Sequence, residues 1–437
     1  MNRIYLTFIA LFLSSFAANA EVDIQEVTSK GGITAWLVEE HSIPFTALEI
    51  RFKGGASLDP AGKRGATSLM TYTLEEGAAD LDARQFAAAA DGLAASFDFD
   101  IGDDTLSISA RFLTENHDQA IELLRKAIQE PRFDQAAIDR VRAQVISSPQ
   151  DEVKDPNTIS SRRFKSMAFA GHPYASNRDG TKESITNLTR DDLLAAKDAV
   201  MARDRVYIGA VGDITPAQLG EMLDILLGSL PEKGAAFPAK TDFQLGGGVT
   251  VVPFDTPQSV VVFGHTGIDR HDDDFFAAYI MNTILGGSGR QSRLMEEVRE
   301  KRGLTYGVYS YFMARDYANA YLGRVASAND KVAQAIKVIQ NEWVKMAENG
   351  VTAEELDGAK TYLTGAYPLR FDGNAPIANI LVGMQTQGLP IDYIATRNDK
   401  VNAVTLADIA RVAKRLVRPD DLHFVVVGQP EGISSTD

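Results

Sequence analysis

Apolar and polar positions in residues 293–313 follow two successive patterns. Leu294 and Val298 lie four residues apart, a spacing that places both side chains on one face of a helix, and the charged residues between them fall on other faces. Gly303 suits the left-handed residue that ends a helix. Residues 304–313 are rich in aromatic and β-branched side chains. The pattern predicts a charged helix that ends at the glycine and leads directly into a strand.

The same periods divide the rest of the chain into strands and helices. Short alternating runs bounded by glycine or proline predict strands, and apolar positions three or four apart predict helices. In the first half the predicted strands are 22–28, 33–39, 47–52, 95–101, 105–112 and 205–211, and the predicted helices are 66–76, 82–93, 116–129, 134–148, 157–170, 189–202 and 215–227. This mixture predicts an α+β fold in which helices pack on a mostly antiparallel sheet.

The second half of the chain repeats the pattern of the first. Residues 189–212 align without a gap on residues 405–428, at an offset of 216 (405 − 189 and 428 − 212). Apolar positions coincide, as when Leu193 falls on Ile409. A repeat of this length predicts two homologous domains.

A segment without periodicity separates the two halves. Residues 229–248 contain two prolines and end in a run of three glycines, a composition typical of a linker. The predicted domains are therefore 21–228 and 249–437.

Composition restricts the classes of function. Of the 437 residues 45% are apolar and 24% are charged, which is the balance of a globular protein. A formal net charge of −15 argues against a nucleic-acid partner, because no basic surface would attract phosphates.

The first 20 residues resemble a secretory signal peptide. Asn2 and Arg3 begin a short positive region, an apolar run follows, and small residues end it at Ala20. We expect cleavage after Ala20 and a periplasmic mature protein; the alternative is an uncleaved anchor, for which the apolar run is short. The absence of cysteine fits a chain that depends on its core rather than on disulfides, and no later segment reads as a membrane span.

The glycine-rich segment at residues 286–289 and the helix that follows it in residues 293–303 closely resemble a signature of the pitrilysin/insulinase family of zinc peptidases. The glycines are Gly286, Gly287 and Gly289, and they precede Arg299 and Tyr306, which lie seven residues apart at the junction of helix and strand. The resemblance implies two similar α+β domains that face each other around a cavity. It also implies that the arginine and the tyrosine contact the substrate backbone and that the glycines let an extended peptide approach. The alternative reading is an ordinary amphipathic helix with solvated charges.

The catalytic motif of this family is replaced in this chain. Active members carry H-x-x-E-H on a helix of the first half, where two histidines and a distant glutamate bind zinc and the inner glutamate activates water. The corresponding residues here are Ser68, Thr71 and Tyr72, and the distant position falls near Ser147. Serine and tyrosine are poor zinc ligands, and the threonine hydroxyl has no accessible pKa near neutrality for a general base. The sequence predicts no catalytic residue and no metal in this chain.

Other catalytic arrangements find little support. His265 and His271 flank a turn beside three consecutive aspartates, and we interpret this cluster as a solvated turn rather than a metal site. Glu75 and Glu76 are adjacent and therefore point to different faces of a helix. The chain has no cysteine for thiol catalysis and no G-x-S-x-G signature.

The family resemblance leads to one favoured hypothesis and one alternative. The chain looks like the catalytically blank subunit of a two-chain peptidase, similar in role to the non-zinc subunit of mitochondrial processing peptidase. It would bind a peptide substrate extended along a sheet edge, for which residues 95–99 are a candidate, and present Arg299 and Tyr306 to substrate held at the zinc of a homologous partner. The alternative is a structural or binding protein of the same fold without a role in proteolysis. A stand-alone peptidase with relocated ligands is a third possibility.

Overall fold

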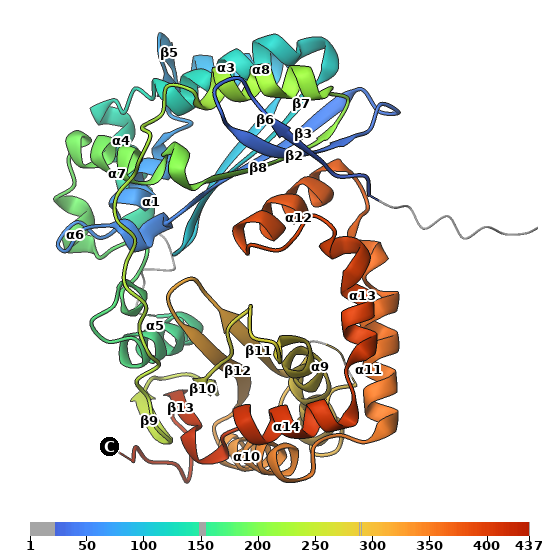
Figure 1. Ribbon diagram of the computed structural model, residues 1–437. Coiled ribbons are helices and arrows are strands. Elements are labelled where there is room, and N and C mark those ends of the chain that lie inside the picture. The colour runs from blue at the N-terminus through green and yellow to red at the C-terminus, as the bar shows by residue number, and fades with distance from the viewer. Residues whose placement is uncertain (1–21, 148–153, 288, 290, 437) are drawn as a thin grey trace, which may run out of the picture.

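The computed structural model describes residues 22–147, 154–287, 289 and 291–436. The predicted signal peptide therefore lies outside the described residues. Two halves, each built on one sheet, lie one above the other in Figure 1. Among the described residues, no helix combines the length and apolar character needed to cross a bilayer. The predicted fold class, α+β with two facing halves, is confirmed.

The first sheet has six strands in the order β1-β2-β8-β3-β7-β6. All neighbouring pairs are antiparallel except β2 and β8. The strands are β1 Gln25–Thr28, β2 Thr34–Glu39, β3 Phe45–Lys53, β6 Ser96–Ile101, β7 Thr105–Leu113 and β8 Val206–Gly212. β6 is an edge strand, so it has only one partner.

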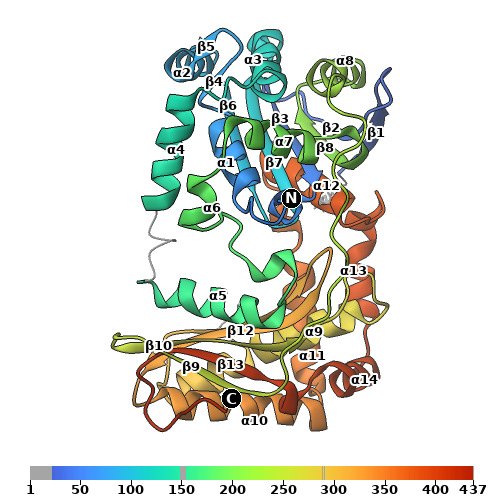
Figure 2. The same ribbon diagram turned by 90° about the vertical axis from the view of Figure 1, so that its left-hand side faces the viewer.

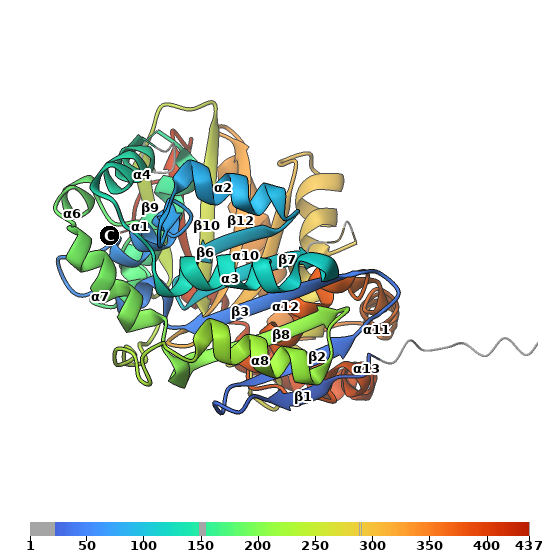
Figure 3. The same cartoon turned by 90° about the horizontal axis from the view of Figure 1, so that it is seen from above.

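Helices cover the outer face of this sheet, as Figure 3 shows from above. The apolar faces of these helices pack on the side chains that β3 and β7 direct toward them, and together they form one continuous core. They are α1 Ala66–Thr73, α2 Ala83–Gly92, α3 His117–Gln129, α4 Gln135–Ser147, α6 Lys182–Thr186, α7 Arg190–Val200 and α8 Pro216–Leu227. A small hairpin of two short strands, β4 Gly77–Ala78 and β5 Leu81–Asp82, precedes α2.

The second sheet has five strands in the order β11-β12-β10-β13-β9, and its only parallel pair is β13 with β9. The strands are β9 Gly248–Pro253, β10 Gln258–Thr266, β11 Val308–Ala314, β12 Asn319–Ala328 and β13 His423–Gly428. Its helices are α9 Phe275–Gly286, α10 Val332–Asn349, α11 Ala353–Gly365, α13 Tyr393–Ala403 and α14 Leu406–Leu416. A core around Phe263, Trp343 and Phe424 joins the sheet to α9, α10 and α14.

The sequence repeat is visible in matching elements. Thr189 and Asp192 form a capping box before α7, and Thr405 and Asp408 form the same box before α14. Each of these helices leads into the strand that makes the single parallel pair of its sheet, β8 or β13. When the second strand order is read in reverse, β9-β13-β10-β12-β11 matches β2-β8-β3-β7-β6, so β11 takes the position of β6. The two edge strands are therefore equivalent.

Each half also lends a helix to the sheet of the other half. Helix α5, Pro156–Ala168, packs on β10 and β13, where Phe164 joins Val262 and Val425. Helix α12, Asn374–Thr386, packs on β3 and β8 of the first sheet. Figures 1 and 2 show both helices between the two sheets. The faces of the sheets that look toward each other are thus covered reciprocally.

A glycine in β8 permits the close approach of α12. A Cβ atom on Gly209 would lie 2.7 Å from the carbonyl oxygen of Ala378 in α12, closer than real Cβ contacts. Across the same contact, the side-chain amide of Gln385 donates to the Ile208 carbonyl at 2.7 Å. At Gly209 the helix therefore touches the strand backbone directly, beside the apolar contacts that Leu381 makes with side chains of the sheet.

Candidate functional site

Helix α1 carries Ser68, Thr71 and Tyr72, the residues at which the sequence predicts the replaced motif. A buried carboxylate fixes its start: Asp59 accepts hydrogen bonds from the backbone amides of Gly65 at 2.8 Å and Thr67 at 2.9 Å. These amides have no partner within the helix, so the carboxylate takes the place of an ordinary cap. Gly65 has a φ of 93°, which favours glycine.

Ser68 and Tyr72 lie one turn apart and meet the same loop. The Ser68 hydroxyl donates to the Arg178 carbonyl oxygen at 3.0 Å, and the Tyr72 hydroxyl donates to Asp179 Oδ1 at 3.1 Å. The third position, Thr71, turns away and donates to the Thr67 carbonyl of its own helix at 2.8 Å. The face of α1 that carries Ser68 and Tyr72 is therefore in contact with the loop through Arg178 and Asp179.

These side chains do not fit a zinc ion. Burial raises the pKa of the Tyr72 phenol to about 12, with the nearby Asp179 carboxylate adding to the effect, so the phenol stays protonated near neutrality. The Ser147 hydroxyl, at the end of α4, bonds the Gln144 carbonyl at 3.1 Å. Within the part of the chain that the structure describes, no group of three His, Cys, Asp or Glu side chains converges as metal ligands would.

The histidines considered in the sequence occupy different environments. His265 is fully buried in β10, so it is not part of a solvated turn as we had interpreted it. Its Nδ1 lies 2.8 Å from the Thr266 carbonyl oxygen, and its Nε2 accepts from the Trp343 indole at 3.1 Å. The neighbouring aspartates Asp272 and Asp274 pair instead with arginines of α14.

The loop that fills the α1 face is anchored tightly. Arg64 donates to the Pro173 carbonyl at 2.6 Å and to the Ser176 hydroxyl at 2.8 Å. Close backbone approach adds to this, since a Cβ on Gly180 would lie 2.3 Å from the Arg64 carbonyl oxygen. Sequence reasoning missed this loop. The run Asn177-Arg178-Asp179-Gly180 signals only a turn, and nothing local shows that it contacts α1.

The edge strand β6 lies beside α1 and has free backbone groups. The Gly102 amide donates to the Thr105 carbonyl at 2.8 Å, and hydrogen-bonded pairs alternate along an antiparallel ladder. Asp98 and Asp100 therefore bond to β7, whereas Phe99 and Ile101 direct their amides and carbonyls to the open edge.

Two side chains already approach this open edge. Arg178 donates to the Ile101 carbonyl at 2.7 Å. Burial raises the pKa of the Glu75 carboxyl, with Asp98 adding to the effect, while the Phe99 amide opposes it. The candidate edge at residues 95–99 therefore corresponds to the open side of edge strand β6, which pairs only with β7 and lies next to α1.

Arg299 and Tyr306 lie just before β11. Residues Met295–Glu300 form a π-helical turn, and Gly303 then takes a φ of 59°, as the predicted stop requires. Arg299 is one-third exposed and pairs with Glu300 at 3.5 Å. Tyr306 is 87% exposed, the most of any large apolar or aromatic side chain among the described residues. Their predicted contact with substrate is untested, but neither side chain is engaged in the core.

The strand after this turn begins later than predicted. β11 starts at Val308, not at residue 304, because Thr305 bonds the Ala326 carbonyl at 2.6 Å through its side chain instead of its backbone. Tyr306 therefore stands on an irregular segment that precedes the equivalent of edge strand β6.

The glycines before this segment have different surroundings. A Cβ on Gly286 would meet Ser310 Oγ at 2.2 Å, and one on Gly287 would meet the Thr283 Cα at 2.8 Å, so both are required by packing around α9. Nothing lies within 4 Å of such a Cβ on Gly289. Ser288, between them, lies outside the described residues.

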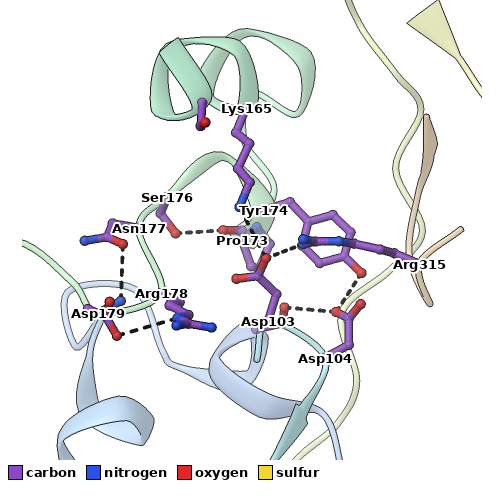
Figure 4. A network of polar contacts seen from close by, with 12 residues as sticks. Asp103, Asp104, Lys165, Pro173, Tyr174, Ser176, Asn177, Arg178, Asp179 and Arg315 are labelled. Carbon is purple, nitrogen blue, oxygen red and sulfur yellow. Dashed lines mark hydrogen bonds and ion pairs between the residues drawn. The ribbon is translucent and has the colours of Figure 1, made fainter. Parts of the chain in front are cut away.

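A polar network joins the two halves near the loop (Figure 4). Asp103, in the β6–β7 turn, pairs with Arg315 of the second half and lies 3.6 Å from Lys165 of α5. Burial alone would raise the pKa of Asp103, but the two cations lower it below its usual value. Burial lowers the pKa of Lys165 in spite of the nearby carboxylate.

Asp104 adds a second contact between the halves. It accepts a hydrogen bond from the Tyr174 hydroxyl at 2.6 Å, and this hydroxyl in turn accepts from the Tyr317 amide at 3.3 Å. Sequence reasoning missed these residues because their partners lie in the other half of the chain.

Comparison with known proteins relates the chain to a peptidase family. A family profile for the peptidase M16 inactive domain matches residues 187–363. The non-peptidase homolog YmxG of Helicobacter pylori is 30% identical over 393 residues, which cover 89% of this chain and 90% of the relative. The beta subunit of the mitochondrial processing peptidase of Neurospora crassa is 21% identical over 346 residues, which cover 74% and 71%.

A solved structure agrees with this relationship. The crystal structure of a peptidase M16 inactive domain from Pseudomonas fluorescens superposes with a TM-score of 0.85 at 27% identity. The match covers 93% of this chain and 98% of the other. The whole described fold is therefore shared.

Proposed function

Since this chain belongs to the peptidase M16 family and its motif residues do not fit zinc, we propose that it is a non-catalytic, peptide-binding subunit of a heterodimeric zinc metalloendopeptidase. The zinc would be held by a homologous partner subunit. The likeness to the beta subunit of a mitochondrial processing peptidase supports the existence of a partner subunit.

The observation that carries the proposal is the open edge of β6. An extended peptide can add to such an edge as a further strand, with backbone hydrogen bonds that read little of its sequence. Phe99 and Ile101 direct their amides and carbonyls to this edge. A peptide would pair with the Phe99 carbonyl and the Ile101 amide, and it would displace Arg178 from the Ile101 carbonyl and Glu75 from the Phe99 amide. The exposed carboxylates of Asp98 and Asp100 flank these groups. No catalytic group is needed for this role.

Arg299 and Tyr306 would act on the same peptide. The guanidinium of Arg299 offers several directed donors to a substrate carbonyl or carboxylate. The phenol of Tyr306 would donate to the peptide or to its scissile carbonyl at the partner's zinc. The exposure of Tyr306 supports this role, because a core tyrosine could not reach a ligand.

The proposal includes a periplasmic location, on the basis of the predicted signal peptide in residues 1–20. The partner would then be an exported chain of similar length from the same organism that carries an intact H-x-x-E-H. Such a partner and this chain would meet in the same compartment.

The test is reconstitution. Peptide cleavage is measured for this mature chain, for the zinc-bearing partner and for their mixture, with a sizing run to establish whether they associate. The proposal expects activity in the mixture that neither chain shows alone. If the chains associate and the partner cleaves equally well without this chain, the alternative holds, and the chain is a binding or structural protein outside proteolysis.

A further inference from the structure

A large cavity lies where the β6 edge ends. Its volume is about 1100 Å³, and its walls come from the β6–β7 turn, α5, the loop 175–182 and two arginines of the second half. In Figure 4 the side chains of Lys165, Arg178 and Arg315 surround the turn at Asp103. We call this the basic cavity.

The charge of the basic cavity is opposite to that of the chain. Seven arginine and lysine side chains line it, against three carboxylates, in a protein whose formal net charge is −15. Among the cations are Arg163, Lys165, Arg178, Lys182, Arg315 and Arg324. These cations repel one another when the site is empty. An anionic ligand relieves that repulsion and is attracted by every cation of the site, so its binding is favourable.

The three carboxylates are already engaged. Asp103 is paired with Arg315 and lies near Lys165. Asp155 accepts from the amides of Asn157 and Thr158 at the start of α5. Asp179 accepts from the Tyr72 hydroxyl. Asp179 also lies 3.7 Å from Arg178. Three carboxylates cannot balance the charge of seven cations.

Several cations, by contrast, lack a carboxylate partner. Among the residues that the structure describes, Arg324 donates only to the neutral Ser161 hydroxyl, at 2.7 Å. Arg163 and Lys182 are exposed, and no ion pair of theirs occurs within the described ranges. These side chains are free to meet a ligand from solution.

The basic cavity continues the peptide-binding edge. Ile101 is the last residue of β6, and Gly102 and Asp103 of the next turn line the cavity. Arg178 bridges the two, because it donates to the Ile101 carbonyl and lines the cavity as well. A peptide paired with β6 that extends past Ile101 therefore enters the basic cavity.

We propose that the basic cavity binds acidic side chains of the peptide that pairs with β6, so that this chain selects substrates with a cluster of Asp or Glu residues beyond the strand-forming segment. The inference rests on the proposed function, because it needs a peptide at the edge. It adds to that function a preference for one class of sequence.

The experiment measures binding of short fluorescent peptides to the full mature chain by anisotropy. All peptides share one neutral strand-forming segment, followed by a segment that contains Glu, Gln or Lys. Both termini are blocked in all peptides but one. The remaining peptide has the Gln sequence and a free terminal carboxylate. The double variant Arg163→Gln/Lys182→Gln is compared with Lys337→Gln/Lys414→Gln, which removes the same charge at exposed positions on α10 and α14.

We expect the Glu peptide to bind more tightly than the Gln peptide by about tenfold at low salt, and the Lys peptide to bind most weakly. High salt should reduce the difference, since screening weakens exposed pairs. The cavity variant should lose the preference for Glu, and the control variant should keep it. The Gln peptide should bind both variants alike.

Other outcomes separate the two proposals. Equal binding of the Glu and Gln peptides overturns the basic cavity as a specificity site and leaves the proposed function standing. Tight binding of only the peptide with a free terminal carboxylate also overturns it, because the ligand is then a chain end. Binding of no peptide overturns the proposed function and this inference together.

Discussion

The hydroxyl of Tyr72 donates a hydrogen bond to Asp179 Oδ1 across 3.1 Å. One turn earlier, Ser68 bonds the backbone of the preceding residue, Arg178. The two positions that we predict to correspond to zinc ligands of active relatives thus contact a loop in this chain. The replacement changes more than the ligands: it gives the α1 face a new structural partner.

Removal of this contact should cost stability. In Tyr72→Phe the Asp179 carboxylate, which is only 13% exposed, loses a donor, so we expect the free energy of unfolding to fall by about 1–2 kcal/mol. Tyr362→Phe, at a 59% exposed tyrosine, is the matched control and should change it little. Denaturant titration of both variants checks this. Equal stability would mean that the hydrogen bond contributes nothing net.

Restoring the motif should not restore metal binding. In Ser68→His/Thr71→Glu/Tyr72→His the loop through Arg178 still covers the helix face, and no carboxylate stands at Ser147. We expect far less than one tightly bound zinc per chain after dialysis, by elemental analysis. A stoichiometric and active triple variant would show that a third ligand lies elsewhere.

Loss of Arg299 or Tyr306 should slow the reconstituted enzyme. A hydrogen bond made in the transition state is worth on the order of 3 kcal/mol, so Arg299→Ala or Tyr306→Phe should lower kcat/KM about a hundredfold. Lys301→Ala is the control on the same helix, where the ammonium pairs with Glu297 at 2.7 Å and its loss should cost little. Wild-type rates from both variants in assembled complexes would leave this chain as a scaffold.

His265 should make the second half sensitive to acid. Burial lowers the pKa of its imidazole from 6.5 to about 4, so between these values the unfolded chain binds a proton that the folded chain does not. Stability is therefore complete above pH 6.5 and falls as the pH drops toward 4, by about 3 kcal/mol in all. In His265→Gln this part of the pH dependence should disappear. Parallel unfolding profiles of variant and wild type would contradict the assignment.

The contact between α12 and β8 should tolerate no added methyl group. Gly209→Ala places a Cβ against the Ala378 carbonyl, so we expect a loss of about 1–3 kcal/mol in the free energy of unfolding. Gly358→Ala, in the open middle of α11, should instead stabilise the chain slightly. Thermal unfolding of the two variants compares them directly. Similar midpoints would show that the helix can shift at no cost.

Local rules were enough to predict much of this fold. The period of apolar positions predicted the helix at α7, and the offset of 216 that aligns residues 189–212 with 405–428 predicted its equivalent at α14 and two similar halves. The helix that carries Ser68, Thr71 and Tyr72 was also predicted, because its spacing is local, and the assignment of these residues to the motif stays a prediction.

Long-range contacts could not be predicted in this way. No pattern shows that α5 leaves its own half, or that Arg178 and Asp179 fill the former metal face. The cations of the basic cavity are likewise scattered over more than 160 positions, from Arg162 to Arg324, and only the fold gathers them. Local sequence rules describe neighbours along a helix or strand, whereas these contacts depend on how the two sheets are brought together.

The exchange of α5 and α12 between the sheets bears on how the chain can be divided. A cut in the segment 229–248 would leave each fragment without the helix that covers its own sheet, and Phe164 on one side or Leu381 on the other would lose its apolar partners. Neither fragment is then a self-sufficient folding unit, although the two halves repeat the same order of elements. The two halves should therefore unfold in a single cooperative transition. Because α5 and α12 each pack on the sheet of the other half, these two helices fix the separation of the sheets.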